Sequence, residues 1–189
     1  VRGTITQERY TLLLSDLRRL PEQIQSILEK NITRIQYIAS NFVAVKDSFF
    51  IGRGIDYAAA MEGSLKLKEI SYVHSEAYPA GELKHGPIAL IENGTLVTAI
   101  ITQEELLKKT ISNIVEVSSR GAFILTIANE GSEEVERVSD AVIYIPKTAK
   151  YYTASLSVVV LQLLAYYVSA GKGLDVDKPR NLAKSVTVE

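Results

Sequence analysis

Apolar side chains follow two different spacings along the chain, and the first spacing predicts helices near the start. From Pro21 to about Asn41, isoleucine and leucine recur at every third or fourth position, which predicts an amphipathic helix that begins at the proline. Residues 1–20 also place leucines at helical spacing. We expect this segment to be a short connecting helix packed on another part of the protein.

The second spacing consists of short, almost wholly apolar runs, and it predicts five strands: 47–51, 73–78, 95–101, 122–128 and 141–145. Helical patterns separate several of them, at 55–70, 104 to about 118 and 153 to about 170. Apolar strands alternating with helices are typical of a parallel sheet buried on both faces. The sequence therefore predicts an α/β fold, a doubly wound, flavodoxin-like sheet of five parallel strands with helices on both faces and ligands at the carboxyl ends of the strands.

The final segment, residues 172–189, shows neither a helical nor an alternating period. It carries apolar residues such as Leu182 and Val186, so we expect an irregular tail that docks on the domain. The predicted organisation is a connecting segment at 1–20, one domain at 21–171 and a C-terminal tail at 172–189. Because the chain begins with Val1, we also expect it to be a piece of a longer protein.

Composition narrows the classes of function. Lys and Arg total 21 against 22 Asp and Glu, so a net charge of -1 provides no general attraction to nucleic acid or acidic lipid. The absence of cysteine excludes disulfides, thiolate metal sites and a cysteine nucleophile, and the two histidines lie in separate contexts. The apolar run 154–168 is interrupted by polar residues and is too short to span a bilayer. We therefore expect a cytoplasmic protein without a metal site, a membrane segment or a nucleic-acid partner.

The first candidate motif is Gly52-Arg53-Gly54, directly after the first predicted strand. A dinucleotide-binding fingerprint needs a third glycine, but position 57 is tyrosine, and no phosphate-loop lysine follows. We favour the simpler interpretation, in which the glycines permit a tight turn from strand to helix.

The second candidate is a charged face on the following helix. Glu62, Lys66 and Glu69 step by four and three residues and therefore line one side. Such triplets are usually exposed ion pairs. The surroundings of Glu69 favour more than that, because three polar residues follow within a few positions: Ser71, His74 and Glu76.

Two further candidates lie in irregular segments. His85 is followed by Gly86 and Pro87 on a constrained loop, where an imidazole can act as an acid or base on a ligand or can simply be exposed. Lys184 in the tail can form a Schiff base with a carbonyl if it is desolvated, or can remain an ordinary charged lysine. The residues alone leave both questions open.

Four segments together resemble the isomerase half of the glucosamine-6-phosphate synthase family, also called glutamine:fructose-6-phosphate aminotransferases. They are residues 52–54, 62–72, 76–87 and 175–189, and they occur in the family's order. The resemblance runs from the first helix to the last residue and identifies the chain as similar to the second sugar-isomerase (SIS) domain with the C-terminal tail.

The resemblance implies an activity and roles for individual residues. The family converts fructose-6-phosphate to glucosamine-6-phosphate, towards UDP-GlcNAc, with ammonia from glutamine and without a metal or organic cofactor. Lys184 matches the lysine that forms an imine with the sugar C2 carbonyl, and Glu69 matches the base that moves a proton between C1 and C2. His85 matches the residue that opens the sugar ring, Lys66 a lysine close to the reacting oxygens, and Ala183 a substrate contact.

The resemblance also implies partners. The family's chains carry a glutaminase domain and a first SIS domain, and the histidine reaches the site of the neighbouring subunit, which implies a homodimer. The family holds the sugar phosphate on a Ser- and Thr-rich loop of the first SIS domain. The corresponding turn here, 102–105, reads Thr-Gln-Glu-Glu and puts two carboxylates where a phosphate needs free N–H groups.

We therefore expect no phosphate site at this turn, and we expect the isolated chain to be nearly inert. Two alternatives remain open. One is a noncatalytic SIS module that senses a phosphosugar. The other is a related deglycase or deaminase that acts on an amino sugar.

Overall fold

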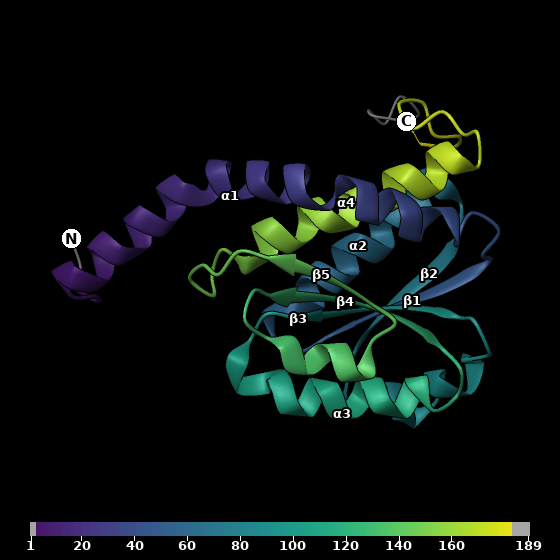
Figure 1. Ribbon diagram of the computed structural model, residues 1–189, viewed down its shortest axis with the longest axis horizontal. Coiled ribbons are helices and arrows are strands. Elements are labelled where there is room, and N and C mark those ends of the chain that lie inside the picture. The colour runs from purple at the N-terminus through teal and green to yellow at the C-terminus, as the bar shows by residue number, and fades with distance from the viewer. Residues whose placement is uncertain (1–2, 183–189) are drawn as a thin grey trace, which may run out of the picture.

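The computed structural model describes residues 3–182, and these form a three-layer α/β domain (Figure 1). The central sheet has five parallel strands in the order β2-β1-β3-β4-β5. The strands are β1 (Asp47–Gly52), β2 (His74–Pro79), β3 (Leu96–Ile101), β4 (Phe123–Asn129) and β5 (Ala141–Ile145). This order confirms the predicted doubly wound, flavodoxin-like sheet, because the connections reverse direction between β1 and β3.

Helices cover both faces of the sheet (Figure 1). On one face lie α1 (Gln7–Ser40), α2 (Ile55–Ser71) and α4 (Thr153–Gly171). On the other lie α3 (Leu107–Ser118) and the 3-10 helix η4 (Glu133–Val138). The shorter 3-10 helices are η1 (Leu83–His85), η2 (Pro87–Leu90) and η3 (Glu104–Leu106).

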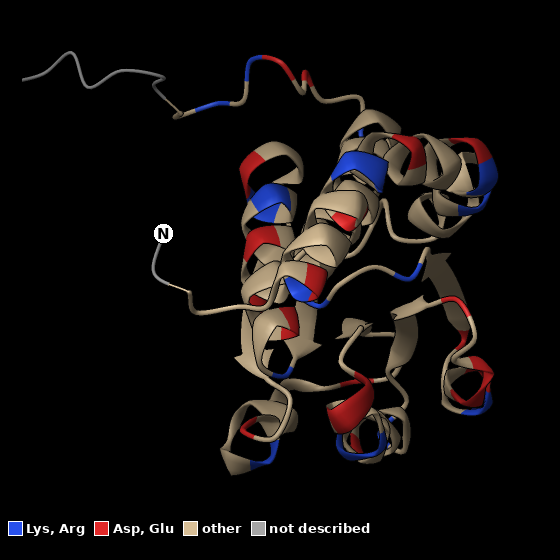
Figure 2. Cartoon of the chain, turned by 90° about the vertical axis from the view of Figure 1, so that its left-hand side faces the viewer, with Lys and Arg blue, Asp and Glu red and all other residues tan. Residues whose placement is uncertain are grey.

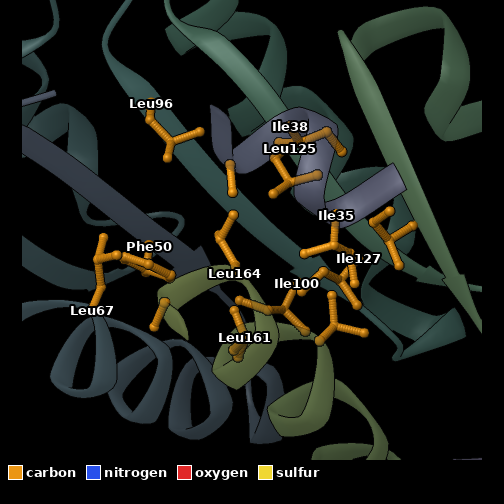
Figure 3. Packing of buried hydrophobic residues seen from close by; sticks show 14 of the residues in the cluster. Ile35, Ile38, Phe50, Leu67, Leu96, Ile100, Leu125, Ile127, Leu161 and Leu164 are labelled. Atoms are coloured by element: carbon orange, nitrogen blue, oxygen red, sulfur yellow. The ribbon is translucent and has the colours of Figure 1, made fainter. Parts of the chain in front are cut away.

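Each face of the sheet has its own apolar core, because every second strand residue points to one side. Figure 3 shows the core beneath α1, α2 and α4, where Phe50 and Ile100 from the sheet meet Leu161 and Leu164 from α4. All four side chains are at most 1% exposed. Burial of each such side chain stabilises the fold by roughly 1.5–3 kcal/mol.

The first helix differs from the prediction. Residues 1–20 and 21–41 were expected to form separate helices, but α1 runs without a break from Gln7 to Ser40 and contains Pro21 in its interior. Proline removes one backbone hydrogen bond, and the helix tolerates this because apolar residues beyond it, such as Ile27 and Ile35, are fully buried. The predicted boundary between 20 and 21 therefore falls within a continuous helix, whose N-terminal half projects from the domain (Figure 1).

The apolar run 154–168 was expected to be too short to span a bilayer, but the helix that contains it, α4, is long and apolar enough in composition to cross a membrane. In this fold, however, it lies between α1 and α2 and packs on the sheet, with Leu156, Val160 and Val168 at most 1% exposed. A central position in the core explains its apolar sequence.

On the helices that face outward, Lys and Arg lie close to Asp and Glu (Figure 2).

The Gly52-Arg53-Gly54 turn performs the structural role expected of it. A Cβ atom on Gly52 would lie 2.5 Å from the backbone carbon of Asp56, and Gly54 has a φ of 56°. Both positions therefore require glycine for the strand to pass directly into α2. Between them, the guanidinium of Arg53 donates to Asn113 Oδ1 on α3 at 2.8 Å.

Candidate active site

Charged side chains gather near the end of α2. Lys66 Nζ donates to Glu69 Oε2 at 2.6 Å and lies 3.7 Å from Glu62 Oε1. The predicted shared face of the three residues is thus present. The side chains of Lys66 and Glu69 are only 30% and 26% exposed, so this pair is more enclosed than an ordinary surface ion pair.

The pair fixes the protonation state of Lys66. Its hydrogen bond to Glu69 raises the pKa of Lys66 above its ordinary value, because the neighbouring carboxylate favours the charged amine. A protonated amine can stabilise negative charge but cannot attack a carbonyl. Among the two lysines singled out from the sequence, Lys66 therefore fits the role of an electrostatic neighbour rather than of a nucleophile.

Glu69 lines a surface pocket of about 520 Å³ at the amino edge of the sheet. Helix α2 starts where β1 ends and returns to the point where β2 begins, so its last turn lies at this edge. The residues that line the pocket come from the end of α2, the start of β2 and the described end of the tail: Leu65, Lys68, Glu69, Tyr72, Val73, His74, Arg180, Asn181 and Leu182. A carboxylate and the C-terminal tail therefore share one pocket.

Tyr72 joins the tail to this pocket. Its hydroxyl accepts a hydrogen bond from the backbone N–H of Arg180 at 2.8 Å, and the Arg180 guanidinium carbon lies 4.2 Å from the centre of its ring. Tyr72 is also the C-cap of α2 and has a left-handed backbone conformation, with a φ of 58°. The described part of the tail does contact the domain here, but through Arg180 and not through the apolar Leu182 that the prediction named, which is 51% exposed.

The end of α4 is hydrogen-bonded to the end of α2, close to this pocket. Lys172 Nζ donates to the carbonyl of Ser71 at 3.1 Å, and Ser169 Oγ donates to the carbonyl of Ile70 at 2.7 Å. These bonds satisfy two of the carbonyls that a helix end leaves without partners. Partial burial lowers the pKa of Lys172. The place where the tail leaves α4 is thereby tied to the end of α2.

His74 belongs to this pocket, whereas His85 does not. His74 Nδ1 lies 3.0 Å from Asp47 Oδ1, and its Nε2 lies 3.6 Å from Glu76 Oε1. His85 ends η1, beyond the carboxyl end of β2, and its side chain is exposed. Within one chain, Glu69 and His85 therefore occupy opposite edges of the sheet, and the fold does not bring them together.

The carboxyl edge of the sheet carries another pocket of about 520 Å³, lined in part by residues 102–105 and 147–150. The backbone N–H of Thr102 donates to Asp56 Oδ2 at 2.8 Å, and its hydroxyl donates to Asp56 Oδ1 at 2.5 Å. An internal carboxylate thus occupies two donors that a phosphate would need. Glu104 adds a further negative charge to the turn, 3.5 Å from Lys147. These contacts leave fewer donors free for a phosphate, and the absence of a phosphate site at this turn stays a prediction.

Two predicted site residues, Ala183 and Lys184, lie outside the described residues. Three residues that the sequence analysis gave no individual role do line or support the pocket, namely Tyr72, Arg180 and Lys172. Tyr72 carried one weak signal, since it lies two residues beyond the predicted helix end at 70, near the position where glycine or asparagine is usual. The contact with Arg180 spans 108 positions and had no local signal.

Comparison with known proteins shows the family of the chain. The SIS domain family model matches residues 42–171. The chain is 57% identical, over its whole length, to the glutamine–fructose-6-phosphate aminotransferase (isomerizing) of Caldanaerobacter subterraneus subsp. tengcongensis, and 48% identical to that of Thermus thermophilus. It spans 31% of the length of each of these relatives.

Solved structures show the same relationship. The C-terminal domain of glucosamine-fructose-6-phosphate aminotransferase from Francisella tularensis superposes with a TM-score of 0.88 at 36% identity, over 93% of this chain and 49% of that one. Glucosamine-6-phosphate deaminase from Thermotoga maritima superposes with a TM-score of 0.66 at 26% identity, over 96% of this chain and 50% of that one. The chain belongs to the SIS domain family and matches the C-terminal SIS domain in the isomerase half of the glutamine–fructose-6-phosphate aminotransferases.

Proposed function

We propose that this chain supplies the proton-transfer and imine-forming residues of a glutamine–fructose-6-phosphate aminotransferase, which makes glucosamine-6-phosphate from fructose-6-phosphate and ammonia. One observation carries the proposal. Glu69, held by Lys66 at 2.6 Å, lines the same pocket as the tail residues that lead directly to Lys184. A base and a potential carbonyl nucleophile can therefore act on one substrate.

In the proposed reaction, the Lys184 amine forms an imine with C2 of the open-chain sugar and releases water. Ammonia then adds to C2 and displaces the lysine amine, which leaves a C2 imine of ammonia. Glu69 moves a proton from C1 to C2 of this imine while the C1 hydroxyl proton passes to nitrogen, which gives the amino aldose. The reach of the chain supports this assignment, because two residues beyond Leu182 extend at most about 7 Å before the lysine side chain begins. Protonated Lys66 would stabilise the negative charge that develops on the sugar oxygens.

The remaining parts of the reaction are assigned to other parts of the assembly. The contacts of Asp56 and the charge of Glu104 oppose phosphate binding at the turn after β3, so the phosphate is assigned to a first SIS domain. Ammonia is assigned to a glutaminase domain. The placement of His85 away from Glu69 supports a homodimer in which the histidine opens the sugar ring at its neighbour's site. We place this enzyme in the cytoplasm.

The proposal is tested by removal of the lysine from the full-length enzyme. Lys184→Ala should lower kcat by roughly 10³-fold or more, because the covalent intermediate is lost, while fructose-6-phosphate still binds. Lys178→Ala is the matched control, since Lys178 is an exposed lysine of the same tail and should have no effect. Turnover and isothermal titration together provide the two readouts.

The same experiment separates the alternatives. If wild type binds the phosphosugar tightly without turnover, and Lys184→Ala binds equally well, the chain is a sensor module. If wild type releases ammonia from glucosamine-6-phosphate but makes none of this sugar from fructose-6-phosphate and glutamine, it is a deaminase. Either result would contradict the proposed function.

A further inference from the structure

Tyr72 and Arg180 form two contacts of different kinds. The backbone N–H of Arg180 donates to the Tyr72 hydroxyl at 2.8 Å, and the guanidinium lies over the same ring at 4.2 Å. The hydrogen bond fixes the backbone of the tail, and the stacking fixes the side chain. We refer to this pair of residues as the tail clamp.

The backbone at both sides of the tail clamp is unusual. Within residues 3–182, positive φ values outside glycine are confined to Tyr72, at 58°, and Asn181, at 60°. Both residues line the pocket that contains Glu69. Disfavoured backbone conformations persist only where the surroundings impose them, and they concentrate at functional sites. Their coincidence here indicates that the tail is held in one defined path.

Hydrogen bonds also fix the start of the tail, where it leaves α4. Ser169 on α4 and Lys172 directly after it bind the last carbonyls of α2, and the N–H of Leu174 donates to the carbonyl of Ser169 at 3.1 Å. The tail is therefore fixed where it begins, near Leu174, and fixed again at Arg180. Without the second anchor, the free segment that ends at Lys184 would begin at Leu174.

We propose that Tyr72 is a positioning residue, which acts through Arg180 to hold the tail so that Lys184 reaches the sugar beside Glu69. This inference rests on the proposed function. Lys184 is four residues beyond Arg180 but ten beyond Leu174. At about 3.5 Å per residue, the intact tail clamp limits its α-carbon to roughly 14 Å from the anchor, against roughly 35 Å without the clamp.

Chain statistics give the smallest effect to be expected. The local concentration of a tethered group falls with about the three-halves power of tether length, so lengthening from four to ten residues lowers it roughly fourfold. Loss of a fixed orientation of the Lys184 amine lowers the rate further, because the amine reacts with the carbonyl only within a narrow range of distances and angles. Release of the tail clamp should therefore lower kcat by roughly four- to 100-fold.

Three variants of the full-length enzyme separate the contacts. Tyr72→Phe removes the hydrogen bond and keeps the ring. Arg180→Ala removes the stacking and lies in the tail, so that the folded domain is left unchanged. Tyr72→Asn removes both contacts, with a residue that tolerates a left-handed backbone. Tyr151→Asn is the control, because Tyr151 is another surface tyrosine beside a cation, Lys150 at 5.8 Å, and it is more exposed than the half-buried Tyr72.

Two measurements are made on each variant: hydrogen–deuterium exchange of peptides that cover residues 175–182, and steady-state kinetics. Tyr72→Asn should speed exchange in these peptides by roughly tenfold and lower kcat with a smaller change in KM, since the phosphate contacts remain. The two single-contact variants should give intermediate effects in both measurements. Tyr151→Asn should match wild type.

The outcomes that overturn the proposal are distinct. Unchanged exchange in Tyr72→Asn and Arg180→Ala would show that the clamp does not hold the tail. Faster exchange with unchanged kcat would show that it holds the tail without positioning Lys184. A wild-type enzyme that forms no glucosamine-6-phosphate would refute the proposed function and with it the catalytic part of this inference, while the exchange data would still report whether the tail clamp exists.

Discussion

At the scale of single residues, the contacts around α2 assign different chemistry to two ionisable groups. The raised pKa of Lys66 keeps it cationic beside Glu69. Asp56, at the other end of the same helix, is 4% exposed and is held by the donors of Thr102. Lys66 is exposed enough to contact a ligand, whereas Asp56 is enclosed within the fold.

Asp56 leads to a prediction about pH. Burial raises its pKa above the ordinary 3.8, so the folded state binds this proton more tightly than the unfolded state. The resulting stabilisation is complete below 3.8 and is lost as the pH rises through the folded-state pKa. Between about pH 4 and 7, the free energy of unfolding of wild type should therefore fall relative to that of Asp56→Asn.

Urea denaturation across this pH range measures that difference, and Asp177→Asn in the exposed part of the tail is the control. The free energy of unfolding of Asp177→Asn should differ from that of wild type by the same amount at every pH. A wild type that instead gains stability relative to Asp56→Asn as the pH rises would show that the hydrogen bonds from Thr102 outweigh the cost of burial.

At the scale of elements, the turn from β1 into α2 depends on Gly52. An added Cβ would collide with the backbone of Asp56 at 2.5 Å, which no side-chain movement can relieve. Gly52→Ala should therefore lower the free energy of unfolding by roughly 1–3 kcal/mol, measured by chemical denaturation.

Gly63→Ala is the comparison variant. There the atoms nearest to the new methyl belong to the side chains of Leu161 and Phe50, at 2.8 Å and 3.1 Å, and alanine gains about 1 kcal/mol of helix propensity over glycine. Gly63→Ala should cost clearly less than Gly52→Ala. Equal effects at the two positions would mean that the turn relaxes more easily than its backbone contacts indicate.

The elements also show what sequence reasoning can and cannot provide. The apolar strands and the glycine turn were predicted correctly because both depend on local pattern. The break at Pro21 was wrong, because burial of residues such as Ile27 sustains the helix through a proline. The separation of Glu69 from His85 depends on strand order, and the contact of Tyr72 with Arg180 depends on tertiary packing. Neither leaves a periodic signal.

At the scale of the whole molecule, Glu69 and His85 lie at opposite edges of the sheet. We therefore predict that each site combines Glu69 of one subunit with His85 of the other. If His85 acts at the neighbour's Glu69, a mixed dimer of Glu69→Gln and His85→Ala contains one fully intact site. Two inactive homodimers mixed and reassembled should then recover roughly a quarter of wild-type activity, since about half of the dimers are mixed and each has one working site of two.

The control is a mixture of Glu69→Gln with Lys184→Ala, both assigned to the same chain's site, which should remain inactive. Recovery in the control but not in the His85 mixture would reverse the assignment of residues to subunits. Absence of recovery in both mixtures, with reassembly verified by size and mass, would place His85 in its own chain's site.

If the tail lysine bonds to the sugar in the pocket of Glu69, reduction with borohydride traps the imine that joins them. Full-length enzyme is incubated with fructose-6-phosphate and borohydride, digested, and mapped by mass spectrometry. We expect a reduced sugar adduct on Lys184, retained in Glu69→Gln and absent in Lys184→Arg. An adduct on Lys66 instead, or none in an enzyme that turns over normally, would contradict this expectation.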